Sequence, residues 1–305
     1  MRALFVIPIL LLLVSCSESN QETDSPENNL NGKVKSITKM QYTAEESFGK
    51  VDGKRLQQGS KLVFNKYGKL IKKFSTDLKG KLYLEASYKY DRNRNLVART
   101  DYDSDGTSGG KYTYTYDSEG QMTTEKYENP LIDDVIDKAT FSYDQAGSLI
   151  QKDNHVGDDL SSRIMYKYDD QGNLVEESDY DADGSLSLRN YYKYDKDGNQ
   201  TENTLYSDNG KALQKYTRSY NNNGQILREV RHVYHNNIRL ETSFKYDQIG
   251  NVIEEDETKT TGSKERNRKK SYEYNYDEKN NATKVVEFVN GKASTLTEIK
   301  LEYFD

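Results

Sequence analysis

The sequence predicts an all-β protein, an antiparallel meander of hairpins that forms a long twisted, spiralling sheet or open barrel. Three observations predict this fold. Turn motifs built from Tyr-Asp and Gly recur along the chain, and aromatic residues alternate with polar ones before each turn. Only 33% of the 305 residues are hydrophobic, which argues against a thick core.

The turn motif recurs with a nearly constant period. One aromatic residue precedes each copy, and successive aromatics lie 25 to 30 residues apart, most often 26. Such regularity indicates one structural unit repeated along the chain. We call these the first-turn aromatics, and they are Phe64, Tyr90, Tyr116, Tyr143, Tyr168, Tyr194, Tyr220, Tyr246, Tyr276 and Tyr303.

Most copies have a glycine four residues after the aromatic. There it closes a type I turn by adopting the left-handed conformation of a bulge. Arg94 and Asn280 replace it in two copies. Asn tolerates this conformation and Arg does not do so readily, so the turn at Asp91 is predicted to use a different geometry. The predicted structural glycines are Gly68, Gly120, Gly147, Gly172, Gly198, Gly224 and Gly250.

A second turn follows twelve residues after the first in several units. A meander must reverse at both ends of its sheet, so one unit is two strands and the chain holds on the order of 20 strands. One face is predicted to carry a Tyr, Leu and Phe ladder, with Leu174 and Tyr180 in phase. The other face carries Lys, Glu, Ser and Thr. The second turns are Tyr102 with Gly106, Tyr180 with Gly184, and Tyr206 with Gly210.

The N-terminus has the features of an export signal. An apolar run of about a dozen residues, too short to span a bilayer, follows Arg2. It ends at Leu-Val-Ser-Cys, which resembles the bacterial lipobox, so Cys16 is predicted to carry lipid. We therefore predict a signal peptide over 1–15, a lipidated flexible tether over 16–32 and a β domain over 33–305. The expected location is the outer membrane, with the cell surface as one option.

The repeat resembles a known family. Copies such as Tyr168-Asp169-Asp170-Gln171-Gly172 and Tyr246-Asp247-Gln248-Ile249-Gly250 are similar to the YD repeat of the RHS family, over about residues 60 to 305. The chain looks most like the short lipoprotein members of Bacteroidota type. The resemblance implies a spiralling antiparallel sheet; large members of the family form shells around a toxin. This chain ends within a repeat, so a toxin cargo is not expected.

Two acidic segments match the opening of a calcium loop, in which alternate carboxylates point at one ion. Neither has the acidic twelfth residue that would complete the site, because Tyr112 and Asn190 stand there. The main prediction is therefore no metal and no cofactor, with calcium as the weaker alternative. The three histidines, His155, His232 and His235, lack neighbours that would suggest catalysis. The candidate calcium residues are Asp101, Asp103 and Asp105 in one segment, and Asp179, Asp181 and Asp183 in the other.

A basic segment, residues 259–270, coincides with the longest spacing in the repeat. It has two interpretations. One is a solvated hairpin insertion, and the other is a contact point for an anionic partner such as a polysaccharide or lipid headgroups.

The function predicted from these features is non-enzymatic. The protein is expected to present a repetitive β surface to a glycan or an envelope protein, with exposed tyrosines such as Tyr191 and Tyr192 available to stack on sugars. The alternatives are an accessory or enzyme in surface polysaccharide processing and an immunity-like partner of a secreted toxin. A net charge of −6 with both signs interleaved argues against nucleic acid.

Overall fold

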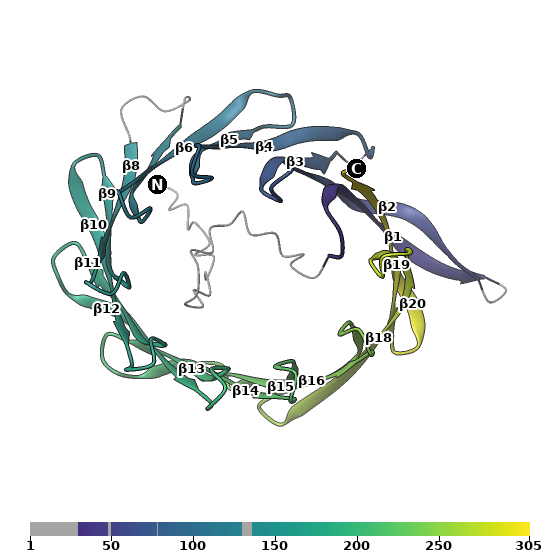
Figure 1. Cartoon of the computed structure of the whole chain (residues 1–305). Coiled ribbons are helices and arrows are strands. Elements are labelled where there is room, and N and C mark those ends of the chain that lie inside the picture. The colour runs from purple at the N-terminus through teal and green to yellow at the C-terminus, as the bar shows by residue number, and fades with distance from the viewer. Residues whose placement is uncertain (1–29, 48–49, 78, 130–135) are drawn as a thin grey trace, which may run out of the picture.

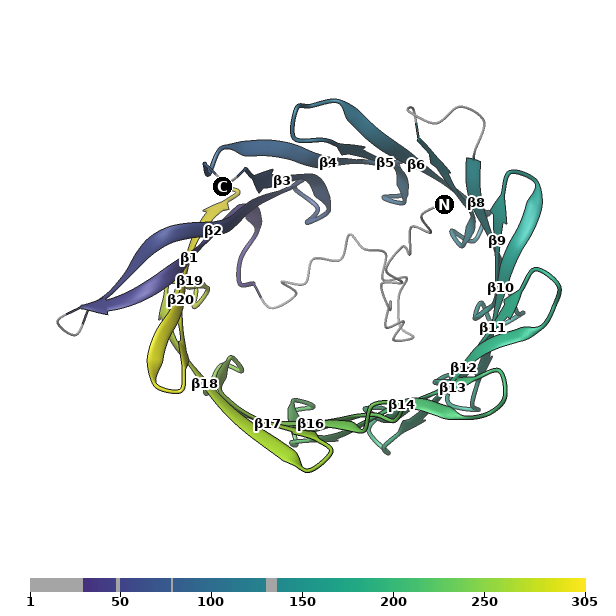
Figure 2. The same ribbon diagram turned by 180° about the vertical axis from the view of Figure 1, so that it is seen from behind.

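The chain forms one closed antiparallel barrel (Figures 1 and 2). The computed structural model describes residues 30–47, 50–77, 79–129 and 136–305. Each strand pairs with the next one along the chain, and β1 pairs with both β2 and β20. The predicted meander and strand number are confirmed for the described residues, but the sheet closes and does not spiral. Within the described ranges the sheet has 20 strands: β1 (Val34–Ser47), β2 (Lys50–Phe64), β3 (Leu70–Thr76), β4 (Leu82–Tyr90), β5 (Leu96–Tyr102), β6 (Ser108–Tyr116), β7 (Met122–Glu128), β8 (Ile136–Tyr143), β9 (Leu149–Val156), β10 (Asp159–Tyr168), β11 (Leu174–Asp181), β12 (Leu186–Tyr194), β13 (Gln200–Ser207), β14 (Ala212–Tyr220), β15 (Ile226–Val233), β16 (Ile238–Tyr246), β17 (Val252–Thr261), β18 (Lys264–Tyr276), β19 (Ala282–Val289) and β20 (Lys292–Tyr303).

The barrel closes where its first strand meets its last. The pairing of β1 with β20 runs from Val34 opposite Tyr303 to Thr43 opposite Thr295. Ile37, in the middle of this seam, is 1% exposed and belongs to the main buried cluster of the barrel. We call this group the seam cluster; it consists of Ile37, Phe64, Leu70, Ala86, Tyr88 and Leu96.

The chain entering β1 is held to the last hairpin. The backbone N–H of Asn31 donates to Oδ1 of Asn281 over 2.7 Å, and Nδ2 of Asn281 donates back to the Asn31 carbonyl over 2.8 Å. Asn281 is buried. This reciprocal pair fixes the start of β1 at the end of the barrel that carries the first turns. In the described part of the chain we find no helix with the length and apolar character needed to cross a membrane.

The first turns have the predicted geometry. In the copy at Asp169, the N–H of Gly172 donates to the Asp169 carbonyl over 3.0 Å, and Gly172 has a φ of 83°. The Asp169 carboxylate accepts the N–H groups of Gln171 and Asn173, so it caps the turn. The turn aspartates are therefore occupied by backbone groups.

The prediction for the turn at Asp91 is wrong. Arg94 has a φ of 69° and donates its N–H to the Asp91 carbonyl over 3.2 Å, as the glycines do in the other copies. Its guanidinium lies 4.4 Å from the centre of the Tyr67 ring on the preceding turn. This cation–π contact offsets part of the cost of the left-handed backbone.

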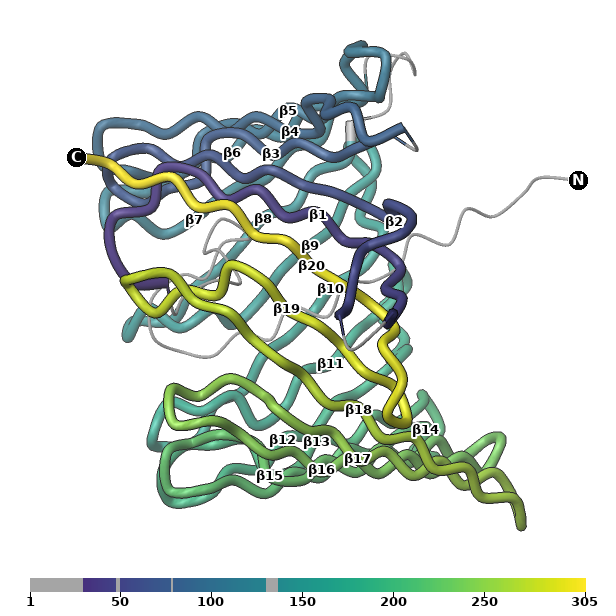
Figure 3. Tube along the Cα trace, turned by 90° about the vertical axis from the view of Figure 1, so that its right-hand side faces the viewer, coloured from purple at the N-terminus to yellow at the C-terminus, as the bar shows by residue number. Residues whose placement is uncertain are grey.

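Chain direction and chirality determine which face of the sheet points into the barrel. In Figure 3, β20 runs to the C-terminus with β1 above it. An L-residue in a strand drawn upward with its side chain toward the viewer directs its N–H and C=O to the right. The N–H of Phe304, just after β20, donates to the carbonyl of Lys33, just before β1, so it points toward the β1 side. We infer that Phe304 and Glu302 point outward, and that Tyr303 and Leu301 point inward.

The two kinds of turn place their tyrosines on opposite faces. A strand that leads into a first turn runs toward one end of the barrel, and a strand that leads into a second turn runs toward the other end. The residue before the turn therefore directs its side chain inward in the first turns and outward in the second turns. Tyr168 is on the inner face with its partner Leu174, whereas Tyr180 lies across from Arg163 on the outer face. The predicted single ladder that includes Leu174 and Tyr180 is therefore wrong. A bulge next to Tyr168 also interrupts the simple alternation.

The first-turn tyrosines fasten neighbouring strands at the end where no turn joins them. The Tyr194 hydroxyl, at the end of β12, donates to the carbonyl of Leu174 at the start of β11 over 2.8 Å. The same bond recurs around the barrel, and Tyr274 takes this role in the unit with the longest spacing. The other donors and acceptors are Tyr90 and Leu70, Tyr116 and Leu96, Tyr143 and Met122, Tyr168 and Leu149, Tyr220 and Gln200, and Tyr246 and Ile226.

Candidate binding site on the inner face

The outer face carries a belt of ion pairs between strands β9 and β18. Glu202, for example, is held by Lys193 at 3.1 Å and by Lys215 at 2.8 Å. We call this set the outer belt. Its carboxylates and their cations are Asp153 with Arg163, Glu176 with Lys167 and Arg189, Glu202 with Lys193 and Lys215, Glu241 with Arg228 and Arg239, and Glu254 with Lys245 and Lys269.

The outer-belt carboxylates are stabilised in their charged form. Burial by itself would raise the pKa of Glu202, but hydrogen bonds from Lys215 and Lys193 outweigh it and lower the pKa below its ordinary value. Hydrogen bonds from Lys245 and Lys269 lower the pKa of Glu254 to about 2. These groups therefore stay ionised throughout the physiological range of pH.

The inner face combines tyrosines with charged groups, several of which are also paired. Four carboxylates on this face bond to cations on the same or a neighbouring strand. Two carboxylates on β11 differ, because neither Glu177 nor Asp179 has a cation within ion-pair distance among the described residues. The inner-face pairs are Glu85 with Lys73, Asp101 with Arg99, Glu229 with Arg218, and Glu255 with Lys270.

Glu177 and Asp179 form the centre of a polar cluster in the middle of the sheet. Glu177 lies between Tyr166 on β10 and Asn190 on β12. Asn190 donates a hydrogen bond to the Glu177 carboxylate and accepts one from Asn203 over 3.4 Å. Within the described structure, Oδ1 of Asp179 is buried with no hydrogen-bond partner. We call this group the inner acidic site; it consists of Tyr166, Glu177, Asp179, Asn190, Tyr192 and Asn203.

The inner acidic site is held toward its neutral form. Burial, followed by repulsion from Asp179, raises the pKa of Glu177 to about 6. Burial also raises the pKa of Asp179. The pKa of Tyr192 rises because of burial and then because of the negative charge of Glu177. Because the pKa of Glu177 is about 6, this carboxyl group is mostly ionised at neutral pH and takes up a proton, which it can then donate, in mildly acidic conditions. It lies beside an Asp179 oxygen that no group in the described structure satisfies.

The predicted calcium residues are not brought together. Asp179 faces inward, whereas Asp183 accepts the N–H and hydroxyl of Ser185 in the turn. In the other segment, Asp101 bonds to Arg99 and Asp105 bonds to Thr107. The described residues contain no group of three or more His, Cys, Asp or Glu side chains placed to hold a metal ion.

Other predicted residues have structural surroundings or lie outside the described ranges. The seven predicted turn glycines all have positive φ. Tyr191 and Tyr192 lie on opposite faces; Tyr191 packs edge-on against Tyr206, and Tyr192 is buried. The His232 ring contacts Tyr234. Cys16 and the signal segment lie outside the described residues.

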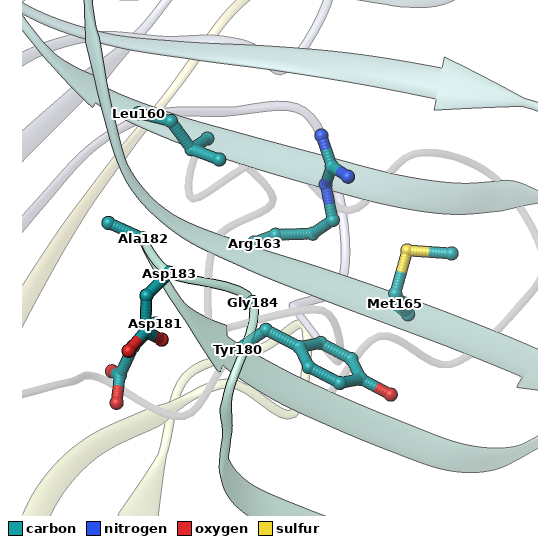
Figure 4. A pocket seen from close by; sticks show the side chains of 8 residues that line it. All are labelled: Leu160, Arg163, Met165, Tyr180, Asp181, Ala182, Asp183 and Gly184. Carbon is teal, nitrogen blue, oxygen red and sulfur yellow. The ribbon is translucent and has the colours of Figure 1, made fainter.

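A hollow on the outer face lies beside the turn between β11 and β12 (Figure 4). Two of its charged groups already have partners. The Arg163 guanidinium donates to both oxygens of Asp153, over 2.7 and 2.8 Å, and Asp183 is occupied by Ser185. We assign no role to this hollow. Its lining is formed by Leu160, Arg163, Met165, Tyr180, Asp181, Ala182, Asp183 and Gly184.

Sequence reasoning missed Glu177, and it named Asp179 only as a candidate calcium residue, because it attributed the acidic residues to the turns. A signal was present. Both residues alternate with outward-facing Ser178, so they share a face of β11, and that face lies beside Tyr166 and Tyr192. Two carboxylates in the aromatic phase of one strand, two residues apart and with no cation between them, form a pattern that strand alternation alone could have shown.

Comparisons with known proteins give matches among solved structures alone. No family model matches the chain, and no curated protein matches it significantly. A porin-like protein from Bacteroides uniformis ATCC 8492 is 11% identical, with a TM-score of 0.38, and the match covers 91% of this chain and 100% of that one. A porin-like protein from Bacteroides vulgatus ATCC 8482 is 10% identical, with a TM-score of 0.26, covering 72% and 97%.

The resemblance to the RHS family is contradicted by these findings. No model of that family matches the chain, and the sheet closes through β1 and β20 where the resemblance implied a spiral. The physical reason is that a Tyr-Asp motif closed by Gly is what a type I turn with a glycine bulge requires. Its recurrence reports hairpin geometry and does not identify a family.

Proposed function

We propose that the protein is a non-enzymatic component of the bacterial cell envelope, anchored by lipid at Cys16, whose barrel stands in water and binds a glycan on its inner face. The inner acidic site carries this proposal. Asp179 is partly exposed and forms no ion pair in the described structure, so a sugar hydroxyl can donate to its carboxylate, and neighbouring tyrosine and asparagine side chains supply further polar contacts.

The outer belt supports a barrel surrounded by water. A membrane-spanning barrel has an outward apolar band, and a Lys or Arg on the lipid face near the midplane costs about 2 to 4 kcal/mol. Lys167, Lys193 and Lys245 remain largely exposed on the outer face although each is ion-paired. Attachment through Cys16 would then hold the protein at the membrane without insertion of the barrel.

A barrel of this size provides room for a ligand. Barrels of 16 to 18 strands already leave a water-filled interior that side chains do not fill. The partly exposed groups of the inner acidic site belong to such an interior, so a glycan could reach them from either open end.

We expect Asp179→Asn to weaken binding of a neutral oligosaccharide about tenfold or more. The variant replaces a charged acceptor by an amide, and hydrogen bonds to charged groups contribute about 1.5 to 3 kcal/mol. A glycan array probed with the full-length chain selects the oligosaccharide, and calorimetric titration measures its affinity. Asp183→Asn, in an exposed turn, is the matched control. Equal affinity for wild type and Asp179→Asn would refute the site.

Anchoring is tested separately. Cys16→Ser removes the only thiol of the chain and is expected to move the protein from the membrane fraction to the soluble fraction, with loss of metabolic acyl labelling. Unchanged labelling and fractionation would show that Cys16 does not carry lipid.

One observation favours a second candidate, an enzyme that cleaves glycosidic bonds. A carboxyl group with a pKa raised to about 6, such as Glu177, suits a general acid. The candidate is distinguished by product analysis: an enzyme would release reducing ends, and Glu177→Gln would abolish that release while leaving glycan binding largely intact.

A further inference from the structure

The hairpin of β17 and β18 carries four cations and one carboxylate, Glu257, on one face, and none of the four cations forms an ion pair in the described structure. Lys259 lies opposite Arg266, and Arg268 lies opposite Glu257. Lys264 starts β18 beside the turn. All four cations are exposed, and none has an ion-pair partner among the described residues. We call Lys259, Lys264, Arg266 and Arg268 the cationic hairpin face.

The four cations share one face because of strand alternation. Lys259 pairs with Arg266, and Lys264 and Arg268 lie two residues to either side, so all four side chains point the same way. The opposite face of the hairpin is nearly neutral. Thr258 donates its hydroxyl to Asn267, and Asn267 donates to Glu265.

The hairpin extends beyond its neighbour on one side. Pairing between β18 and β19 begins at Lys270 opposite Val289, and Asn290 bonds to Lys269. Residues 264–268 therefore keep a free backbone edge on this side, and Figure 3 shows the β17–β18 hairpin projecting from the lower right of the barrel. A free edge offers N–H groups to a ligand, while its cations discourage pairing with another strand.

Alternation places the cationic hairpin face in phase with the inner wall. Lys270, which bonds to Glu255 on the inner face, is two residues from Arg268. The cations thus continue the inner wall past the rim at the second-turn end. Asn31 and the start of β1 lie at the opposite, first-turn end.

We propose that the cationic hairpin face binds an anionic polysaccharide at the mouth of the barrel. Carboxylate, phosphate or sulfate groups on such a chain would pair with the four cations, and its hydroxyls would bond to the free edge of β18. The placement favours a polymer over the membrane, because the cations line the inner side of the rim at the end remote from the start of β1. This site is separate from the inner acidic site.

The test measures binding of the full-length chain to two polyanions, heparin and polygalacturonate, with dextran as the neutral probe. We expect both polyanions to bind, with affinity that falls as salt rises, and dextran not to compete with them. The triple variant Lys259→Gln, Arg266→Gln, Arg268→Gln is expected to bind them about tenfold more weakly.

The matched control is Lys66→Gln, Arg92→Gln, Lys196→Gln, which removes the same charge from the first-turn end. It should change affinity by less than about twofold. Circular dichroism melting confirms that both triple variants fold. Equal weakening by the two triple variants would mean that net charge alone is responsible, and would overturn the proposal. So would failure of both polyanions to bind, or hairpin-dependent binding confined to anionic phospholipid vesicles. Loss of neutral glycan binding in Asp179→Asn would leave this result unaffected.

Discussion

Ile37→Ala is expected to lower the free energy of unfolding by about 2 to 5 kcal/mol, the range found for large-to-small changes in well-packed cores. Ile37 is 1% exposed and lies at the seam, so the truncation leaves a cavity between the first and last strands. Chemical denaturation followed by tyrosine fluorescence and circular dichroism measures the change. Ile249→Ala is the control, because Ile249 is 55% exposed.

The position of Ile37 at the seam increases the expected effect of this substitution on the stability of the barrel. Every other strand pair joins strands that are consecutive in the chain, whereas β1 and β20 are the first and last strands and are held together by pairing and side-chain contacts. Leu301 and Ile299 pack against the seam cluster, and Ser36 donates to Glu302 over 2.7 Å. Opening the seam would expose two strand edges, which favours aggregation. Similar losses for Ile37→Ala and Ile249→Ala would show that the seam does not limit stability.

Glu177→Gln is expected to stabilise the protein at pH 8 by on the order of 2 kcal/mol and to have little effect at pH 4. The pKa of Glu177 is raised to about 6 in the folded state, so the folded state binds this proton more tightly than the unfolded state does. Its favourable contribution is present below the unfolded pKa and is lost as pH rises through the folded pKa. Gln keeps an acceptor for Asn190 and carries no charge.

Glu202→Gln provides a control of opposite sign. The pKa of Glu202 is lowered in the folded state, so its contribution is present above the unfolded pKa and disappears as pH falls through the folded one. This variant should destabilise the protein at pH 8 and have little effect in acid. Denaturation of both variants across pH 3 to 9 checks the pair. A Glu177→Gln variant less stable than wild type at pH 8 would contradict a raised pKa.

Much of the fold was predictable because it is encoded locally. The turn at Asp169 requires an aspartate to cap it and a glycine to take positive φ, and both requirements appear in the sequence. Closure was not predictable in the same way. The register of β1 on β20 depends on residues more than 250 positions apart, such as Ile37 and Leu301, and no turn motif connects them.

The candidate site was harder to predict than the fold. Its chemistry depends on which neighbours surround Glu177 and on how deeply they bury it, and strand alternation gives only the face. The prediction for the turn at Asp91 was wrong for a related reason. The contact that accompanies the left-handed backbone of Arg94 comes from Tyr67, on a different turn. Both errors involve contacts between units, which the repeat pattern does not describe.

In most two-strand units the hydroxyl bond of a tyrosine near the first turn makes the unit self-contained. A turn joins the unit at one end, and a tyrosine such as Tyr194 fastens it at the other. Copying or deleting a segment of 26 residues, the spacing from Tyr168 to Tyr194, would add or remove two strands and leave every remaining fastening unchanged. The diameter of the barrel could thus change during evolution by duplication or loss of such segments, in steps of one hairpin.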